Sequence, residues 1–300
     1  MGRSSKDKRD IYYRKAKEEG WRARSAFKLL QIDEDFNIFE NVKRAVDLCA
    51  APGSWSQVLS RRLYLKGGKR RDEEGASSAA TIVAVDLQPM APVEGVVQIQ
   101  GDITSDETAS EVIRHFEGEK ADLVVSDGAP DVTGLHDLDE FIQSQLILAA
   151  LTIVSHVLRE GGTFIAKVFR GKNVDLLYNQ LKMFFPLVTV TKPRSSRNAS
   201  IEAFVVCQAY APPPGFRPHM LRGVLEGTIT TEGLGTREAR RIVPFVACGD
   251  LNGWDTERTY EGGEGAESAP AMASLAPVQP PIAPPYKKAI EIIKHKHMSA

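Results

Sequence analysis

The segment DLCAAPGSWS, residues 47–56, decides the fold. It overlaps a short apolar run, residues 45–48, and leads into apolar residues at helical spacing, Val58, Leu59 and Leu63. This pattern predicts a strand, a tight turn and a helix, the first unit of an open α/β sheet. Small residues in the turn let a ligand approach the backbone closely, and such sheets bind ligands at the carboxyl ends of their strands. A turn that binds nothing has the same pattern, so the turn alone does not identify a site.

Strand and helix patterns alternate along the next 150 residues. The predicted strands, each a short apolar run, are residues 44–48, 81–85, 96–99, 122–125, 163–169, 187–192 and 200–209. A long helical pattern lies at about 138–159 and is stopped by Gly161 and Gly162, and a shorter one lies at about 174–183. This order predicts an α/β fold with a seven-stranded, mostly parallel sheet and helices on both faces. The link between the last two strands is too short for a crossover helix, so the last strand should run antiparallel.

We predict three parts in the chain. Residues 1–30 form a basic helical segment, residues 31–210 form the main domain, and residues 211–300 form an extension. Residues 66–80 are charged and rich in Gly and Ser, which predicts a mobile surface insertion. The extension holds one apolar island at 242–247, followed by a low-complexity linker and a short basic helix.

The charge is distributed unevenly, although the net charge of the whole chain is only −1. Residues 1–30 carry ten basic and four acidic side chains, whereas the other 270 residues carry 28 basic and 35 acidic ones. The basic segment reads as two helices, broken near Gly20, with the second opened by Ser25. Aromatic side chains interleave with its cations, namely Tyr12, Tyr13 and Trp21. Cations with aromatics suit RNA, but the same aromatics could simply dock the segment on the body.

Several classes of protein are disfavoured. Cys49, Cys207 and Cys248 are an odd and widely spaced set, so neither a disulfide framework nor a zinc site is indicated. The first residues have no apolar signal region, and no apolar run approaches the ~18 residues of a membrane span. We therefore expect an intracellular, soluble, cytoplasmic protein without a metal site.

Four carboxylates follow or end predicted strands: Asp47, Asp86, Asp102 and Asp127. Each could be an ordinary turn or cap residue. Together they line a crevice that suits ribose hydroxyls and positive charge, because the acid after the second strand commonly receives a ribose in dinucleotide folds. The chain has neither a G-x-G-x-x-G fingerprint nor a basic phosphate cradle in the first turn. S-adenosylmethionine, a nucleoside carrying a sulfonium and an ammonium, fits better than a nucleotide, and metal binding is a weaker alternative.

Four motifs in this order resemble the FtsJ-type ribose 2′-O-methyltransferases. They are AAPGSWS at 50–56, SDGAPD at 126–131, AKVF at 166–169 and RSSRNASIEA at 194–203. The resemblance covers about residues 1–210 and implies a Rossmann-like methyltransferase fold that uses S-adenosylmethionine. TGLHDLDE at 133–140 and the tail segments PFVACGDLNGWD and PPIAPPYKKA resemble the eukaryotic branch that modifies the tRNA anticodon loop. That branch implies two accessory partners, a WD-repeat protein and a large helical-repeat protein.

The resemblance implies a catalytic set made of Lys28, Asp127, Lys167 and Glu202. Independently, Lys167 and Glu202 each interrupt an apolar strand, and a buried ammonium without a partner is costly. We assign Lys167 as the principal catalytic lysine and Lys28 as the residue that positions the ribose. We further expect Lys167 to pair with Glu202 across the sheet. A lysine can stabilise the developing 2′-alkoxide, or accept its proton if the pKa of that lysine is lowered.

The resemblance also implies the cofactor-binding residues, which are Gly53, Trp55, Asp86, Asp102 and Asp127. Asp47 is expected to support the loop instead. Three other functions remain open from the sequence: a methyltransferase for rRNA or an mRNA cap, a non-catalytic RNA-binding scaffold, and a nucleotide-dependent oxidoreductase. The intact catalytic set disfavours the scaffold, and the missing glycine fingerprint disfavours the oxidoreductase.

Overall fold

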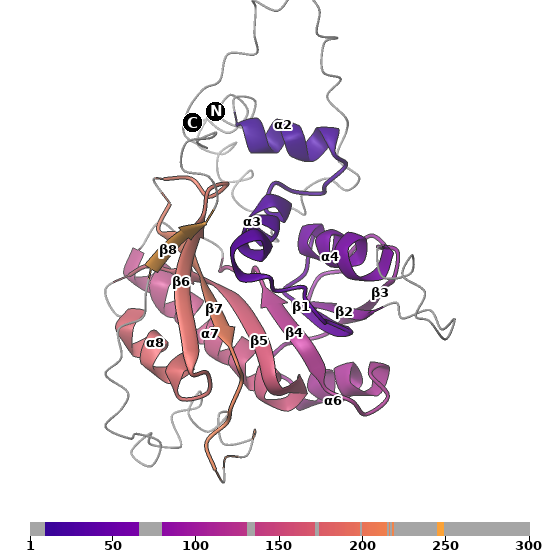
Figure 1. The fold of residues 1–300 in the computed structure, drawn as a ribbon, viewed down its shortest axis with the longest axis vertical. Helices are drawn as coiled ribbons and strands as arrows, with labels where there is room; N and C mark the ends of the chain where they lie inside the picture. The colour runs from indigo at the N-terminus through magenta and orange to yellow at the C-terminus, as the bar shows by residue number, and fades with distance from the viewer. Residues whose placement is uncertain are drawn as a thin grey trace, which may run out of the picture.

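The computed structural model describes residues 10–65, 80–130, 136–171, 174–198, 200–214, 216, 218 and 245–248. The strands are β1 Arg44–Leu48, β2 Thr81–Asp86, β3 Val96–Gln100, β4 Ala121–Ser126, β5 Leu158–Phe169, β6 Leu187–Pro193, β7 Glu202–Gln208 and β8 Phe245–Cys248. The helices are α2 Ile11–Glu18, α3 Ala26–Phe36, α4 Ser54–Leu59, the π-helical turn η1 Ser60–Tyr64, α6 Asp106–His115, α7 His136–Val157 and α8 Val174–Lys182. These helices lie on both faces of a single sheet (Figure 1). The predicted α/β fold is confirmed.

The sheet has the order β3-β2-β1-β4-β5-β7-β6-β8. Neighbouring strands are parallel except at β7, which runs antiparallel to both β5 and β6. The predicted antiparallel last strand is therefore confirmed. β8, from the apolar island of the extension, adds an eighth strand beside β6 that we did not predict. The chain leaves β3 at one edge and returns to β4 beside β1, so the strand order reverses between β1 and β4, where such sheets open a crevice.

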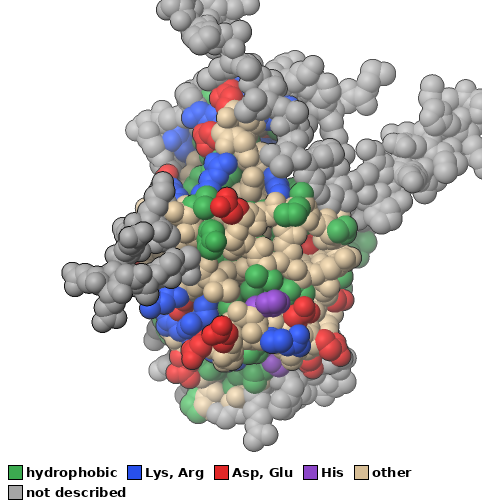
Figure 2. All heavy atoms as spheres, turned by 90° about the vertical axis from the view of Figure 1, so that its right-hand side faces the viewer, with side chains coloured by type: hydrophobic (Ala, Val, Ile, Leu, Met, Phe, Trp, Pro, Cys, Tyr) green, Lys and Arg blue, Asp and Glu red, His purple; other side chains and the backbone are tan. Residues whose placement is uncertain are grey.

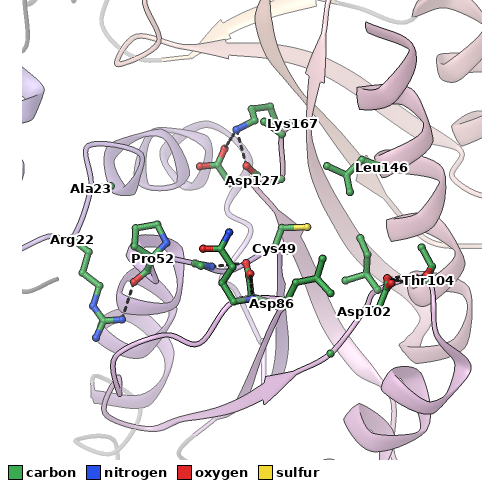
Figure 3. Close-up of a pocket in the computed structure, with 17 residues that line it drawn as sticks. Arg22, Ala23, Cys49, Pro52, Asp86, Asp102, Thr104, Asp127, Leu146 and Lys167 are labelled. Carbon is green, nitrogen blue, oxygen red and sulfur yellow. Dashed lines mark hydrogen bonds and ion pairs between the residues drawn. The ribbon is translucent and has the colours of Figure 1, made fainter. Parts of the chain in front are cut away.

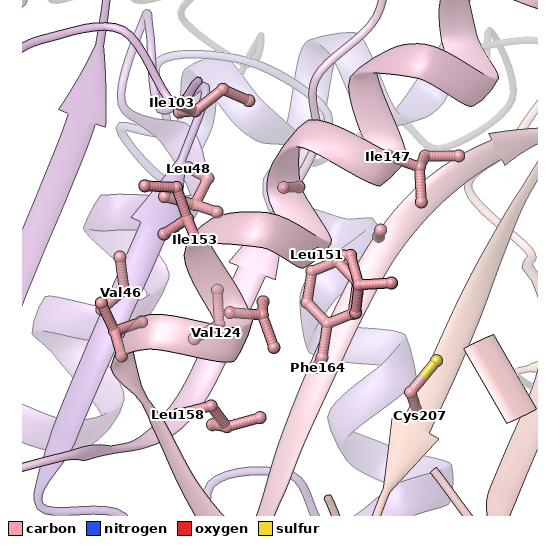
Figure 4. Close-up of a cluster of buried hydrophobic side chains, with 14 of the residues drawn as sticks. Val46, Leu48, Ile103, Val124, Ile147, Leu151, Ile153, Leu158, Phe164 and Cys207 are labelled. Atoms are coloured by element: carbon pink, nitrogen blue, oxygen red, sulfur yellow. The ribbon is translucent and has the colours of Figure 1, made fainter. Parts of the chain in front are cut away.

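Apolar side chains cover both faces of the sheet. On one face, α7 packs Ile147 and Leu151 towards Val124 and Phe164 of the central strands (Figure 4). On the other face, α3 and α4 bury side chains such as Leu29 against the same strands. Burial of each such residue contributes about 1.5–3 kcal/mol. The two layers hold the carboxyl ends of the central strands in fixed positions.

Helix α7 ends earlier than predicted. We expected it to continue to residue 159 before the glycine pair, but it ends at Val157, and β5 begins at Leu158. The physical reason is that the glycine pair belongs to the sheet. The Gly161 N–H donates to the Tyr210 carbonyl at 2.8 Å, and the Tyr210 N–H donates to the Gly162 carbonyl at 3.0 Å.

Residues 138–157 of α7 are also long and apolar enough, by composition alone, to cross a membrane. Most of this stretch is buried inside the protein, where it covers β4 and β5. A core helix of a soluble domain passes the same test of length and apolarity. The helix is therefore accounted for by its packing on the sheet.

The N-terminal segment forms two helices, as predicted. The break falls at Gly20, whose φ of 72° is in the left-handed region that favours glycine. α3 runs past residue 30 and buries Leu29 and Ile32 against the sheet. Tyr12 and Trp21 are also buried. Trp21 docks the segment on the body beneath Arg61, whereas Tyr12 packs on Phe27 of α3 within the segment. The boundary at residue 30 thus falls inside a helix.

The other parts of the domain prediction lie largely outside the described residues. Residues 66–79 of the predicted insertion are not described. Of the extension, the structure describes residues 211–214, 216 and 218 and the backbone of β8. The division into three parts therefore stays a prediction.

Candidate active site

A cavity of about 680 Å³ opens at the carboxyl ends of the central strands (Figure 3). Its walls come from the turn after β1 and from the ends of β2, β3, β4 and β5. Three predicted acids line it together with the predicted catalytic lysine, namely Asp86, Asp102, Asp127 and Lys167. Apolar side chains complete the wall, among them Leu87, Ile103 and Leu146. The cavity thus combines carboxylates with an apolar slot.

Asp86 and Asp102 are held at the wall by hydrogen bonds of 2.8–2.9 Å. Asp86 accepts from the Ala51 N–H at 2.9 Å through Oδ2 and from the Gln88 N–H at 2.8 Å through Oδ1. Asp102 accepts from both the backbone N–H and the hydroxyl of Thr104 at 2.8 Å. Each carboxylate oxygen has two acceptor positions, so both residues keep capacity for ligand hydroxyls.

Asp47 lies beneath the loop and does not line the cavity. It is fully buried, and the Ser56 hydroxyl donates to its Oδ2 at 2.6 Å. Burial raises the pKa of Asp47 to about 7, the Ser56 hydrogen bond opposes the rise, and the charges of Asp127 and Asp86 add to it. Asp47 supports the turn, as expected.

Gly53 and Trp55 are not among the residues that line the cavity. Gly53 has a φ of 100° and caps α4, and a Cβ there would collide with the guanidinium of Arg22. The Trp55 side chain is 2% exposed, and its Nε1–H donates to the Ser25 carbonyl at 2.9 Å. Both residues shape the loop from below. Their contact with a cofactor stays a prediction, and it would have to use the backbone.

Two lysine–carboxylate pairs meet beside the cavity. Lys28 of α3 contacts Glu202, with Nζ–O distances of 2.6 and 2.7 Å. Lys167 of β5 contacts Asp127, with Nζ at 3.0 Å from Oδ1 and at 2.6 Å from the main-chain carbonyl (Figure 3). The structure therefore brings the four predicted catalytic residues together in two pairs.

The predicted pairing of Lys167 with Glu202 is wrong. The antiparallel register places Glu202 opposite Phe169 and Phe204 opposite Lys167. Glu202 is thus a diagonal neighbour of Lys167, at a spacing that long side chains can still bridge. Each lysine nevertheless has a different direct partner: Lys167 contacts Asp127, and Lys28 contacts Glu202. Lys28 reaches both carboxylate oxygens of Glu202 from α3. The Ser196 hydroxyl also donates to Oε1 of Glu202, at 2.8 Å.

The carboxylates keep the Lys167 amine protonated. Lys167 is 9% exposed, and burial by itself lowers its pKa, but Asp127 and Glu202 outweigh burial and the pKa of Lys167 is raised. For Glu202, burial by itself raises the pKa, but Lys28 and Lys167 outweigh it and the pKa is lowered. An ammonium at Lys167 stabilises negative charge, whereas a proton acceptor would need a lowered pKa. The geometry therefore favours electrostatic stabilisation over general-base action.

Arg22 was missed in the sequence, where it was only one of ten basic residues. It lines the cavity and is 7% exposed. Its guanidinium donates to the carbonyls of Pro52 at 2.9 Å and of Pro92 at 2.8 Å, and burial lowers its pKa. Arg22 clamps the loops after β1 and β2 together, a contact that no local sequence pattern signals.

No group of three or more His, Cys, Asp or Glu side chains that could hold a metal ion occurs in the described part of the chain. The polar groups at the cavity are instead arranged as two separate ion pairs and two locally anchored carboxylates. This donor set suits an organic ligand with hydroxyls and positive charge.

Comparisons with known proteins agree with this geometry. Residues 21–210 match the family described as FtsJ-like methyltransferase. The chain is 58% identical to the tRNA (cytidine(32)/guanosine(34)-2′-O)-methyltransferase of Mus musculus, with 100% of this chain and 89% of that protein covered. It is 56% identical to the Schizosaccharomyces pombe protein of the same name, with 100% of both covered.

A solved structure of a ribosomal RNA methyltransferase from Plasmodium falciparum has the same fold. The TM-score is 0.54 at 26% identity, and the match covers 63% of this chain and 98% of that one. The similarity thus extends from the sequence motifs to the arrangement of the sheet. The chain belongs to the FtsJ-like methyltransferase family.

Proposed function

We propose that this protein transfers a methyl group from S-adenosylmethionine to ribose 2′-hydroxyls of the tRNA anticodon loop, at positions 32 and 34. The observation that carries the reaction is the Lys167–Asp127 pair on the wall of the 680 Å³ cavity, at the edge where this fold binds ligands. The choice of tRNA is supported by the full-length similarity to relatives named for that substrate.

The cavity suits the methyl donor, which supplies a methyl group on a positively charged sulfur. Asp86 and Asp102 are anchored with free acceptor capacity and would receive the ribose hydroxyls of the donor. Leu87 is 66% exposed beside the cavity and, with Ile103, offers an apolar surface for the adenine ring. The negative charge around the cavity would attract the sulfonium and the ammonium of the donor.

At the acceptor side, a ribose 2′-oxygen would form a bond to the methyl carbon while the carbon–sulfur bond breaks. The 2′-hydroxyl proton would leave to solvent water as the oxygen becomes more acidic. The ammonium of Lys167 would stabilise the negative charge on that oxygen, and the amine of Lys28 would hold the ribose from the other side. Asp127 and Glu202 would keep the two amines in place.

The RNA would approach over the N-terminal helices, since α3 carries Lys28 into the site. Lys17 lies 4.6 Å from the centre of the half-buried Tyr13 ring on α2, so cations and an aromatic remain at that surface. The face that carries α6 and β3 is different. In Figure 2, the coloured side chains on its lower half mix acidic and basic groups, which gives no field of one sign for a polyanion.

The substrate would be selected with help from accessory proteins, a WD-repeat and a large helical-repeat protein, as the resemblance implies, and the reaction would take place in the cytoplasm. The extension is the part of the chain that we assign to docking them. β8 pairs with β6 as the edge strand of the sheet, so the extension is anchored at that edge.

The test is a map of ribose methylation in total RNA from cells lacking this protein. We expect loss of 2′-O-methylation at positions 32 and 34 of target tRNAs, restored by the wild-type chain and not by Lys167→Ala. Intact tRNA methylation with loss at a site in rRNA or an mRNA cap would overturn the tRNA assignment. Restoration by Lys167→Ala would favour a non-catalytic scaffold.

A further inference from the structure

One buried amide joins helix α7 to strand β5, which carries Lys167, and to the turn after β4, which carries Asp127. Gln143 of α7 is 2% exposed. Its Nε2 donates to the main-chain carbonyl of Lys167 at 2.8 Å and to that of Gly128 at 3.1 Å. The same side chain therefore touches the backbone of the catalytic lysine and of the residue next to Asp127.

The orientation of this amide is fixed by its partners. Two carbonyl oxygens can only be satisfied by the NH₂ group, which has two donor hydrogens. The Oε1 atom then remains buried and without a hydrogen-bond partner among the described residues. A buried acceptor without a partner is costly, about 1–3 kcal/mol. The chain thus tolerates an unfavourable group where the two donated bonds are made.

The position of Gln143 follows from where the strand pairing stops. The last residue pair of the β4–β5 ladder is Ser126 with Ala166. Beyond it, the backbone at Asp127 and Gly128 has left the ladder, and two side chains provide the remaining connections. One is Lys167 itself, through Nζ, and the other is Gln143.

We propose that Gln143 is a positioning residue for methyl transfer: it replaces the missing backbone pairing and fixes the Lys167 ammonium relative to Asp127. The link to methyl transfer rests on the proposed function. The link to the Lys167–Asp127 distance does not, because it concerns only the protein. Without the two donated bonds, the turn after β4 and the strand β5 separate, and the amine of Lys167 moves away from the Asp127 carboxylate.

The first test measures the pKa of Lys167 in the full chain without RNA. The variant is Gln143→Met, which keeps the length and removes both donors. The matched control is Gln145→Met, the same change on the same helix at a residue that does not line the cofactor cavity. The rate of Lys167 acetylation by acetic anhydride is followed against pH by mass spectrometry and normalised to exposed lysines.

We expect the midpoint of Lys167 labelling to shift to lower pH in Gln143→Met and to stay in place in Gln145→Met. Burial persists in both variants, but the raising effect of the carboxylates weakens with distance. Equal midpoints in wild type and both variants would overturn the positioning role, whatever the activity of the protein. If Gln143→Met does not fold, Gln143→Leu also removes both donors without adding a charge near Lys167, so it should give the same shift.

The second test separates kcat from KM in methyl transfer. A misplacement of about 1 Å can cost up to ~10²-fold, so we expect kcat to fall at least about tenfold in Gln143→Met. We expect the fall in kcat to exceed any change in KM for S-adenosylmethionine or for tRNA, because Gln143 reaches the cavity only through the backbone of Gly128 and Lys167. A rise in KM with unchanged kcat would assign Gln143 to binding and contradict positioning. Inactivity of the wild-type chain with tRNA would count against the proposed function, while the pKa shift would still decide the role of Gln143.

Discussion

Strand β4 carries an aspartate near each end, and the two have opposite surroundings. Asp122, at the amino end, accepts from the N–H groups of Lys43 and Arg44 at 2.8 and 2.9 Å and from the Arg159 guanidinium at 2.6 Å. Asp127, just past the carboxyl end, contacts only Lys167 among the described residues and lines the cavity. The first carboxylate is committed to the fold, while the second remains open to a ligand.

This contrast shows that the amino end of a strand can serve the stability of the fold while its carboxyl end serves the reaction. Burial by itself raises the pKa of Asp122, but its hydrogen bonds and Arg159 lower it overall, as in a carboxylate that must stay ionised for the fold. Open α/β sheets bind ligands at the carboxyl ends of strands. We therefore expect changes at the amino edge to alter stability alone, and changes at the carboxyl edge to alter the reaction.

The largest effect is expected from Lys167→Met. Removing one preorganised donor from a developing oxyanion typically costs 10²–10³ in rate, so single-turnover methyl transfer should fall about 10³-fold. The rate is to be expressed per folded molecule, because Lys167 also connects β5 to the turn after β4 and its loss can lower the melting temperature. The counterpart at the other edge is Arg159→Met, which should lower the melting temperature and leave the rate per folded molecule unchanged. A methyl-transfer rate of Lys167→Met within tenfold of wild type would contradict the assignment of the reaction to the carboxyl edge of the sheet.

Asp47→Asn should change how stability depends on pH. Asp47 has a pKa of about 7 in the folded protein and about 3.9 when unfolded, so the folded state binds more protons between these values. The contribution of Asp47 to stability should therefore be lost as pH rises from about 4 to about 7, on the order of 4 kcal/mol. Asparagine carries no titrating proton. In urea unfolding, the free energy of unfolding should therefore differ less between pH 5 and pH 8 in the variant than in the wild type. An equal difference would mean that Asp47 is ionised throughout.

Asp86→Ala should weaken binding of S-adenosylhomocysteine about tenfold, measured by calorimetry, because a hydrogen bond to a charged group contributes about 1.5–3 kcal/mol. The variant loses both the acceptor for the ligand ribose and the anchor of the Ala51 N–H. Asp175→Ala on α8, which does not line the cavity, is the matched control. Unchanged affinity in Asp86→Ala would remove Asp86 from the cofactor site.

The smallest effect is expected from Asp122→Asn, about 1 kcal/mol of unfolding free energy at pH 7, because the Arg159 partner is half-exposed. The pKa of Asp122 is lowered by folding, so its contribution is present above the unfolded value of about 3.9 and is lost as pH falls below it. The variant should resist this acid-induced loss. A tenfold loss of methyl transfer in folded Asp122→Asn would contradict the division between the two edges.

The sequence predicted the first seven strands, the alternation of strands with helices, and the acids at the strand ends. Apolar runs and the residues that follow them can be read from a few neighbouring residues. The sequence marked the apolar island at 242–247 but did not predict β8, since a local run does not show that it pairs with β6, about 55 residues earlier. The helical limit at residue 159 was wrong for a similar reason. Two glycines normally end a helix, but Gly161 and Gly162 pair with Tyr210, which lies about 50 residues later.

The residues of the site could be predicted from the sequence, but the contacts between them could not. Motifs identified Lys28, Asp127, Lys167 and Glu202, and the structure brings them together in two pairs. Which lysine meets which acid depends on the β5–β7 register and on where α3 docks, neither of which the motifs encode. The contacts of Gln143 depend on the same tertiary geometry, so its role could only be inferred from the structure.

The most direct test of the account is a crystal structure of the protein with S-adenosylhomocysteine bound. We predict that the ligand occupies the 680 Å³ cavity, with its ribose hydroxyls at Asp86 and its sulfur facing the amine of Lys167. A ligand bound elsewhere, or a Lys167 amine turned away from the sulfur into solvent, would contradict the claim that methyl transfer takes place at this edge of the sheet.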